Sequence, residues 1–192
     1  MAAVESAVVV YLRALHIGAV PLSVLQYELP TRLLGIEVVR EAATLGMLLA
    51  VAAVAGRNAW QRLLYFALAF GVWDICYYVW LWVFIGWPPS LFTWDVLFLI
   101  PVPWIGPVLA PVAVSLCLVS GALWFLNRPH ERMSRRAWAL ATGGCLLVLL
   151  SFMIDFRHAL LRTDPARFRW EIFVPGIVIA VSAVALSRQS RE

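Results

Sequence analysis

The sequence predicts an all-α fold, a polytopic transmembrane helical bundle of about five spans. The chain is 63% hydrophobic and only 14% charged, with a mean hydropathy of +0.86, which is far from the balance of a soluble domain. Apolar runs near twenty residues long recur with short polar gaps, and about twenty helical residues cross a bilayer. We therefore expect one membrane domain, residues 1–192, in contact with the lipid bilayer.

The residue inventory excludes several classes of function. All fifteen basic residues are arginine, so chemistry that needs a lysine Schiff base is excluded. The three cysteines fall in apolar stretches without a CxxC pair, which argues against a dithiol relay. No phosphate-binding loop and no basic tract with interleaved aromatic residues is present, so we expect no nucleic acid partner.

Residues 1–30 predict an interfacial helix, with a full span as the alternative. Arg13 and His16 lie near the middle of this apolar run and Pro21 interrupts it. An arginine at the bilayer centre costs about 2.5–3.5 kcal/mol even on the lenient insertion scale. The five spans are expected at about 33–55, 63–86, 107–126, 137–156 and 171–186.

Residues 88–106 are rich in tryptophan and proline and predict a re-entrant or surface segment. Its first part, 91–100, is expected to form a short apolar helix with Ser90 as N-cap. The three prolines that follow break helical geometry. Non-helical backbone at membrane depth is tolerated only where protein or water covers it.

Asp74 is the central candidate for ligand binding, because it lies in the middle of the expected 63–86 span. A carboxylate at that depth must be protonated, paired with a cation or exposed to a wet cavity. Tyr77 and Tyr78, three and four residues later, can hydrogen-bond it. The alternative is a buried aspartate that only links helices.

Further candidate ligand-binding residues come from two short patterns. Glu37, Arg40 and Glu41 share one helical face, where they form either part of a ligand site or an ion cluster at the interface. Trp94 and Asp95 repeat the pair at residues 73–74, by function or by chance, and Asp95 also suits the first turn of its expected helix.

His16, Asp155 and His158 are the candidate metal ligands, and the two histidines are candidate haem ligands. No spacing among them is diagnostic, so a haem or transition metal is not favoured. Asp155 and His158 lie three residues apart and alternatively form a salt-linked structural pair.

The five expected spans place these candidates at one membrane face. Four arginines in the loop at 127–136 favour a cytoplasmic position for that loop and for the C-terminus. We therefore expect a bacterial inner-membrane protein whose candidate residues gather at the outer face, with Asp74 below them.

The favoured function is binding or moving a small polar or amphipathic ligand through an outer-face pocket above Asp74, without catalysis. Two alternatives stay open: a metal- or haem-dependent redox protein, and a non-catalytic subunit that docks a membrane protein partner or a second copy of itself.

Two resemblances accompany these residues. The stretches GVWDICYYVWLWVFIGWPPSLFTWDVLFLIPVPWIGPVLAP and QYELPTRLLGIEVVREAAT resemble a group of small bacterial polytopic membrane proteins of uncharacterised function, over most of the chain. The tryptophan content and the WPP at 87–89 are similar to the tryptophan-rich sensory or translocator proteins, although WPP here follows the second expected span. This second resemblance implies five helices that bind porphyrins or sterol-like ligands.

Overall fold

The computed structural model describes residues 1–16, 31–128, 130–161 and 167–189. Five of its helices are long and apolar enough to cross a membrane, which confirms the predicted fold class. The spans are Leu33–Ala55, Ala59–Ile85, Leu109–Leu126, Arg135–His158 and Trp170–Ser187. They differ from the predicted ranges by a few residues at most.

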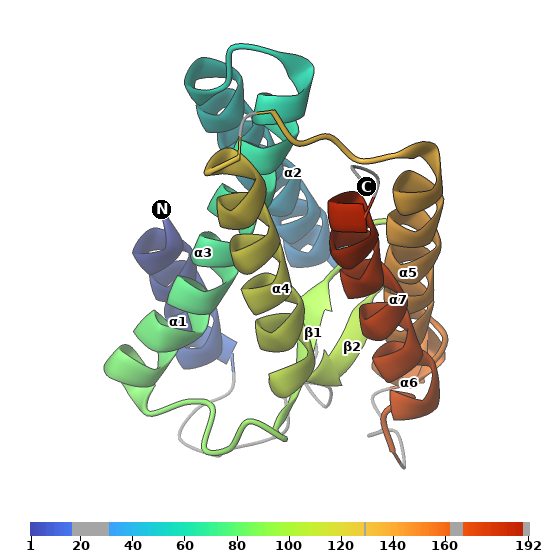
Figure 1. Cartoon of the computed structure of the whole chain (residues 1–192). Helices are drawn as coiled ribbons and strands as arrows, with labels where there is room; N and C mark the ends of the chain where they lie inside the picture. Colours follow the sequence, from blue (N-terminus) through green and yellow to red (C-terminus); the bar gives the residue numbers. More distant parts are fainter. Residues whose placement is uncertain (17–30, 129, 162–166, 190–192) are drawn as a thin grey trace.

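The elements follow one another as helices interrupted by a single described hairpin (Figure 1). In chain order they are α1 (Ala2–His16), α2 (Thr31–Ala55), α3 (Ala59–Ile85), β1 (Trp94–Phe98), β2 (Trp104–Pro107), α4 (Leu109–Leu126), α5 (Arg135–Met153), α6 (Phe156–Leu161) and α7 (Trp170–Gln189).

The connections lie at two opposite ends of the bundle (Figure 1). We call the end that carries residues 86–108, 154–161 and 167–169 the hairpin face. The other end, with residues 56–58, 127–128 and 130–134, we call the arginine face. The sequence predicts the same distribution of the connections between the two ends.

Local capping explains where α3 and α5 begin and where α3 ends. The Asn58 side chain accepts a hydrogen bond from the Gln61 N–H, and the Ser134 hydroxyl accepts one from the Ala137 N–H. Gly86 ends α3 with a φ of 66°, a left-handed conformation that glycine adopts without strain.

The expected helix at 91–100 is wrong, because β1 occupies this segment and pairs antiparallel with β2. Asp95 is therefore a strand residue opposite Gly106 and does not lie in a helical first turn. Ser90 instead closes a turn, with its hydroxyl accepting from the Phe92 N–H. The paired strands satisfy backbone groups that a proline-broken segment would otherwise leave open.

The hairpin reaches into the bundle from the hairpin face. Beyond β1, the backbone N–H of Leu99 donates to the carboxylate of Glu41 at 2.9 Å. Glu41 lies eight residues after Leu33, the start of its span, or about 12 Å along a helix. The hairpin therefore lies partly inside the bundle, where Asp95 and Phe98 are buried.

Helix α1 lies beside the second half of α3 (Figure 1). The Ser6 hydroxyl donates to the backbone carbonyl of Tyr77, and Val9 and Val10 pack on the cluster formed by Tyr78, Leu81 and Val108. At fifteen residues, α1 is about 22 Å long. It packs alongside α3, and residues 17–30 of the expected interfacial helix lie outside the described residues.

Helices α5 and α7 approach each other closely through glycine. A Cβ added at Gly144 would lie 2.5 Å from the backbone nitrogen of Ala180 and 2.6 Å from the carbonyl oxygen of Gly176. Small residues at such contacts let helices pack tightly within a bilayer.

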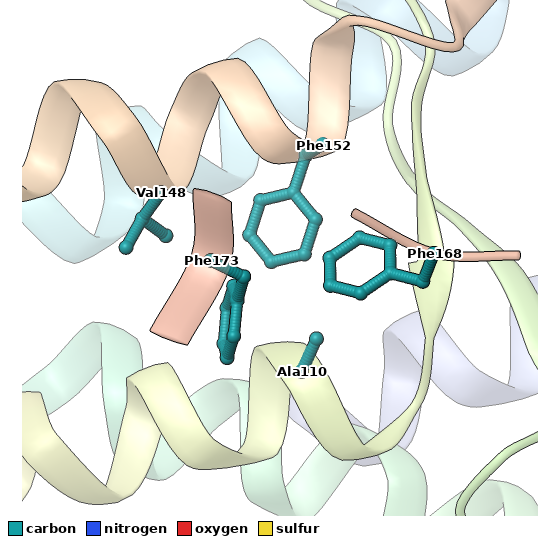
Figure 2. Close-up of a cluster of buried hydrophobic side chains, with 5 residues drawn as sticks. All are labelled: Ala110, Val148, Phe152, Phe168 and Phe173. Atoms are coloured by element: carbon teal, nitrogen blue, oxygen red, sulfur yellow. The ribbon is translucent and has the colours of Figure 1, made fainter. Parts of the chain in front are cut away.

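A cluster of buried side chains connects α5 and α7 to the hairpin and α4. Its members are Ala110, Val148, Phe152, Phe168 and Phe173 (Figure 2). Trp104 of β2 stacks on Phe152 with ring centroids 6.3 Å apart. The hairpin therefore packs on the α5–α7 pair with one side, while its Asp95 contacts α3 with the other.

Candidate functional site: an interior polar cluster

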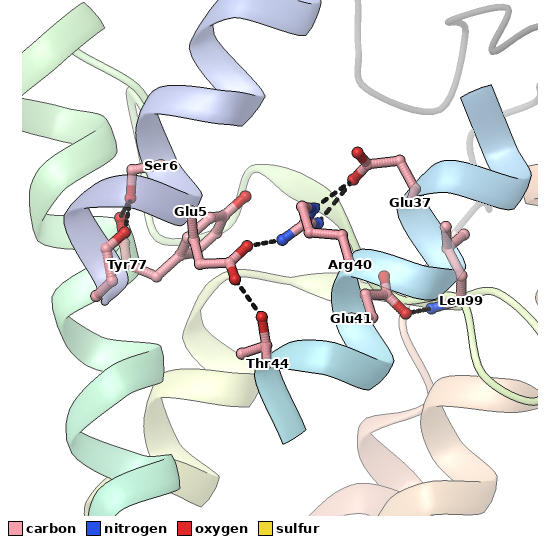
Figure 3. Close-up of polar contacts among 9 residues, drawn as sticks. Glu5, Ser6, Glu37, Arg40, Glu41, Thr44, Tyr77 and Leu99 are labelled. Atoms are coloured by element: carbon pink, nitrogen blue, oxygen red, sulfur yellow. Dashed lines mark hydrogen bonds and ion pairs between the residues drawn. The ribbon is translucent and has the colours of Figure 1, made fainter. Parts of the chain in front are cut away.

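Two helices, α1 and α2, contribute to a network of charges beside the hairpin (Figure 3). Arg40 of α2 forms ion pairs with Glu5 of α1 and with Glu37, the latter at 2.7 Å. Glu5 also accepts a hydrogen bond from Thr44. Glu5, Glu37 and Thr44 are buried, so this network fixes α1 on α2 inside the protein.

Two further carboxylates bind neutral donors. Asp95 accepts a hydrogen bond from the Tyr78 hydroxyl at 3.0 Å, and Asp74 accepts one from the Ser115 hydroxyl at 2.8 Å. Tyr78 lies seven residues before Ile85, the end of α3, or about 10 Å along the helix. Both aspartates therefore lie within the depth of the spans.

Asp95 is the most enclosed of these acids, with 3% of its surface exposed. Burial raises the pKa of Asp95 to about 6, against the opposing effects of the nearby Arg13 guanidinium and of the Tyr78 hydrogen bond. Asp74 is close enough to raise this pKa further. The two aspartates thus share one electrostatic environment.

Tyr77 lies between the two parts of the cluster. Arg13, Arg40, Asp74 and Asp95 all act on it electrostatically. Its ring stacks on Trp73 with centroids 6.2 Å apart. The indole N–H of Trp73 is buried and has no acceptor among the described residues, so a hydrogen-bond donor remains available beside Tyr77.

The acids of the cluster fall into two groups by partner. Glu5 and Glu37 share the Arg40 guanidinium. Glu41, Asp74 and Asp95 accept hydrogen bonds from a backbone N–H or a hydroxyl, and none of the three forms an ion pair with another described residue. Arg13 and Arg40 act on Asp95 and Glu41 through space without pairing with them, and a buried carboxylate without a paired cation is unfavourable when ionised. This second group therefore favours a proton or a bound cationic group.

The other predicted candidates are not part of this cluster. Trp94 and Asp95 are neighbours in β1 and point to opposite sides of the strand. Trp94 therefore lies away from the cluster and packs edge-to-face on Phe168, with ring centroids 6.2 Å apart. Asp155 accepts two hydrogen bonds from Arg169, at 2.8 and 3.0 Å, and lies near His158.

No group of three or more potential metal ligands comes together in the described part of the chain. His158 lies near Asp155, whereas the side chain of His16 is outside the described residues. A metal or haem at these residues stays a prediction.

Four residues of the cluster were not identified from the sequence. Glu5 and Arg13 stand alone as charges in the apolar stretch 1–16, and such isolated charges signal a buried polar partner. Thr44 and Ser115 gave no signal, since serine and threonine are common at helix contacts.

Comparison with protein-family models, with curated proteins and with solved structures found no match to this chain. The two resemblances therefore stay predictions.

Proposed function

We propose that this membrane protein binds or moves a small polar or amphipathic ligand that carries a cationic group, with Asp95 and Asp74 as acceptors of that group. The supporting observation is a pair of neighbouring carboxylates, one buried and one half-buried, that accept hydrogen bonds from the hydroxyls of Tyr78 and Ser115 and form no ion pair with another described residue.

Electrostatics supports the choice of a cationic ligand. Ionised carboxylates within a span are stabilised by a nearby cation, and protons compete for the same oxygens. Tyr77 and the free indole N–H of Trp73 add polar contacts for other parts of the ligand. The stacked Trp73 and Tyr77 rings supply an apolar surface that suits an amphipathic molecule.

The hairpin face is the proposed side of entry, and we assign it to the outside of a bacterial inner membrane. Arg13 lies near this face, with its guanidinium 4.1 Å from the centroid of the Trp87 ring. The arginine-rich connection at 127–136 lies at the opposite end, where the positive-inside rule favours the cytoplasm.

Thermal unfolding of the purified protein in mild detergent tests this proposal. The probes are ammonium, tetramethylammonium and tetraethylammonium chloride, each compared with sodium chloride at equal ionic strength. At pH 7.5 at least one of these cations is expected to raise the melting temperature, because a ligand that binds the folded state stabilises it.

Variants identify where the cation binds. Asp95→Asn and Asp74→Asn are each expected to lower the affinity for the cation at least about tenfold, since each removes a charge at close range. The cation should therefore raise the melting temperature of each variant less than that of the wild type. Glu131→Gln is the matched control, because it removes one carboxylate at the arginine face. The proposal is overturned if no cation exceeds sodium, or if the two aspartate variants respond like the wild type.

A further inference from the structure

The arginine face carries an open depression, which is separate from the interior cluster. It has a volume of about 620 Å³ and is lined by residues of the α2–α3 connection, α3, the α4–α5 connection and α5. Asn58, Trp60, Arg132 and Trp138 are the lining residues with polar or aromatic groups. Because α3 and α5 both begin here, the depression lies at the level where spans meet the lipid headgroups.

Aromatic rings form one wall of this depression. Trp60 packs edge-to-face on Phe125, with centroids 5.1 Å apart, and on Trp138, at 5.7 Å. The Arg132 guanidinium lies 6.0 Å from the centroid of the Trp60 ring. Trp138 remains 42% exposed. Tryptophan is enriched where spans meet the headgroups, because its ring is apolar and its N–H is polar.

The surroundings of the depression are strongly positive. Six exposed arginines lie at this face, and none of them forms an ion pair with another described residue: they are Arg57, Arg62, Arg128, Arg132, Arg135 and Arg136. Glu131 is the single acidic residue in the sequence ranges 56–62 and 127–136. The N-termini of α3 and α5 add partial positive charge. An anion is therefore attracted to this face.

We propose that this depression binds the phosphate headgroup of an anionic phospholipid. Arg132 contacts the phosphate, for which the planar guanidinium is well suited, while Trp60 and Trp138 contact the glycerol and the start of the acyl chains. A lipid accounts for both the charge and the aromatic wall, whereas a free phosphate ion needs only the charge. This site lies at the opposite face from the interior cluster and is independent of the proposed function.

Thermal unfolding with added lipid tests the proposal. The purified full chain in detergent is mixed with dioleoylphosphatidylglycerol, dioleoylphosphatidylcholine or sodium phosphate. We expect phosphatidylglycerol to raise the melting temperature by about 3 °C or more, and the other two to leave it nearly unchanged. A rise that phosphate alone reproduces would overturn the lipid assignment in favour of a soluble phosphate ligand.

Two variants locate the site. Arg132→Gln is expected to lose at least half of the shift caused by phosphatidylglycerol, and Arg132→Lys to lose less, because it keeps the charge but not the planar group. Arg157→Gln is the matched control, since Arg157 is exposed at the hairpin face. An equal shift in Arg132→Gln and the wild type would overturn the proposal, and so would an equal shift with phosphatidylcholine.

Discussion

At the residue scale, Asp95 is the central residue of the proposed ligand site. It is enclosed by the hairpin and α3, and the Tyr78 hydroxyl donates to it. Arg13, Tyr77, Tyr78 and Asp74 are the titratable groups that act on it. Its protonation therefore links the stability of the hairpin to pH.

The first prediction is that Asp95 makes the protein more stable in mild acid. Burial raises its pKa from 3.8 to about 6, so the folded state binds this proton more tightly than the unfolded chain. The resulting stabilisation is full below about pH 4 and is lost as the pH rises through about pH 6.

Melting temperatures of the wild type and Asp95→Asn between pH 4.5 and 7.5 test this prediction. The wild type is expected to lose more stability over this range than the variant, whose amide does not titrate. The same pH dependence in both proteins would contradict the role of Asp95.

The second prediction concerns Glu41, which accepts the Leu99 N–H. Glu41→Leu leaves that half-buried donor without a partner and is expected to lower the free energy of unfolding by about 1–3 kcal/mol. Glu41→Gln keeps an acceptor oxygen and is expected to be milder. Thermal unfolding of both variants measures the difference, and equal losses would argue against the hydrogen bond.

Helical spacing predicted a contact within one helix but not the contacts between helices. Glu37 and Arg40 were expected to pair because they lie three residues apart on one helix, and they do. Glu5 joins them from another helix, and Asp155 pairs with Arg169 fourteen residues later. Such contacts depend on how helices pack, which no local spacing encodes.

At the element scale, the close contact of α5 and α7 gives the third prediction. Gly144→Ala places a methyl group against backbone atoms of Gly176 and Ala180, so the helices must separate and we expect a loss of about 1–3 kcal/mol. Thermal unfolding of the variant in detergent measures this loss.

Gly143→Ala is the control on the same helix, because a Cβ there meets no atom within 4 Å. Alanine stabilises a helix by about 1 kcal/mol relative to glycine, so this variant is expected to be as stable as the wild type or slightly more stable. Similar losses in both variants would contradict the close approach of α5 and α7.

The hairpin was the element that sequence reasoning assigned to the wrong class. Residues 91–100 are apolar without clear alternation, and short apolar runs do not distinguish helix from strand. The deciding interaction is the pairing of β1 with β2 across a proline-containing turn. The prolines did predict an irregular segment whose backbone groups need hydrogen-bond partners, and Glu41 is such a partner for the Leu99 N–H.

At the scale of the whole molecule, apolar length and loop spacing were sufficient to predict five spans. The polar residues that remain within them divide into two regions. Asp95 and Asp74 lie among the spans towards the hairpin face, and Arg132 lies with five other exposed arginines at the arginine face. A cationic ligand and an anionic headgroup would therefore bind at separate places in one protein.

The most direct test of the central proposal is carboxyl modification by dicyclohexylcarbodiimide, a hydrophobic reagent that reacts with protonated carboxyl groups. The purified protein is treated at pH 5.5 and at pH 7.5, with and without tetraethylammonium chloride, and adducts are located by peptide mass spectrometry. We predict an adduct on Asp95 that is weaker at the higher pH and is reduced by the cation. Absence of an adduct on both Asp95 and Asp74, or labelling that the cation leaves unchanged, would contradict the proposal that these carboxylates receive a cationic ligand.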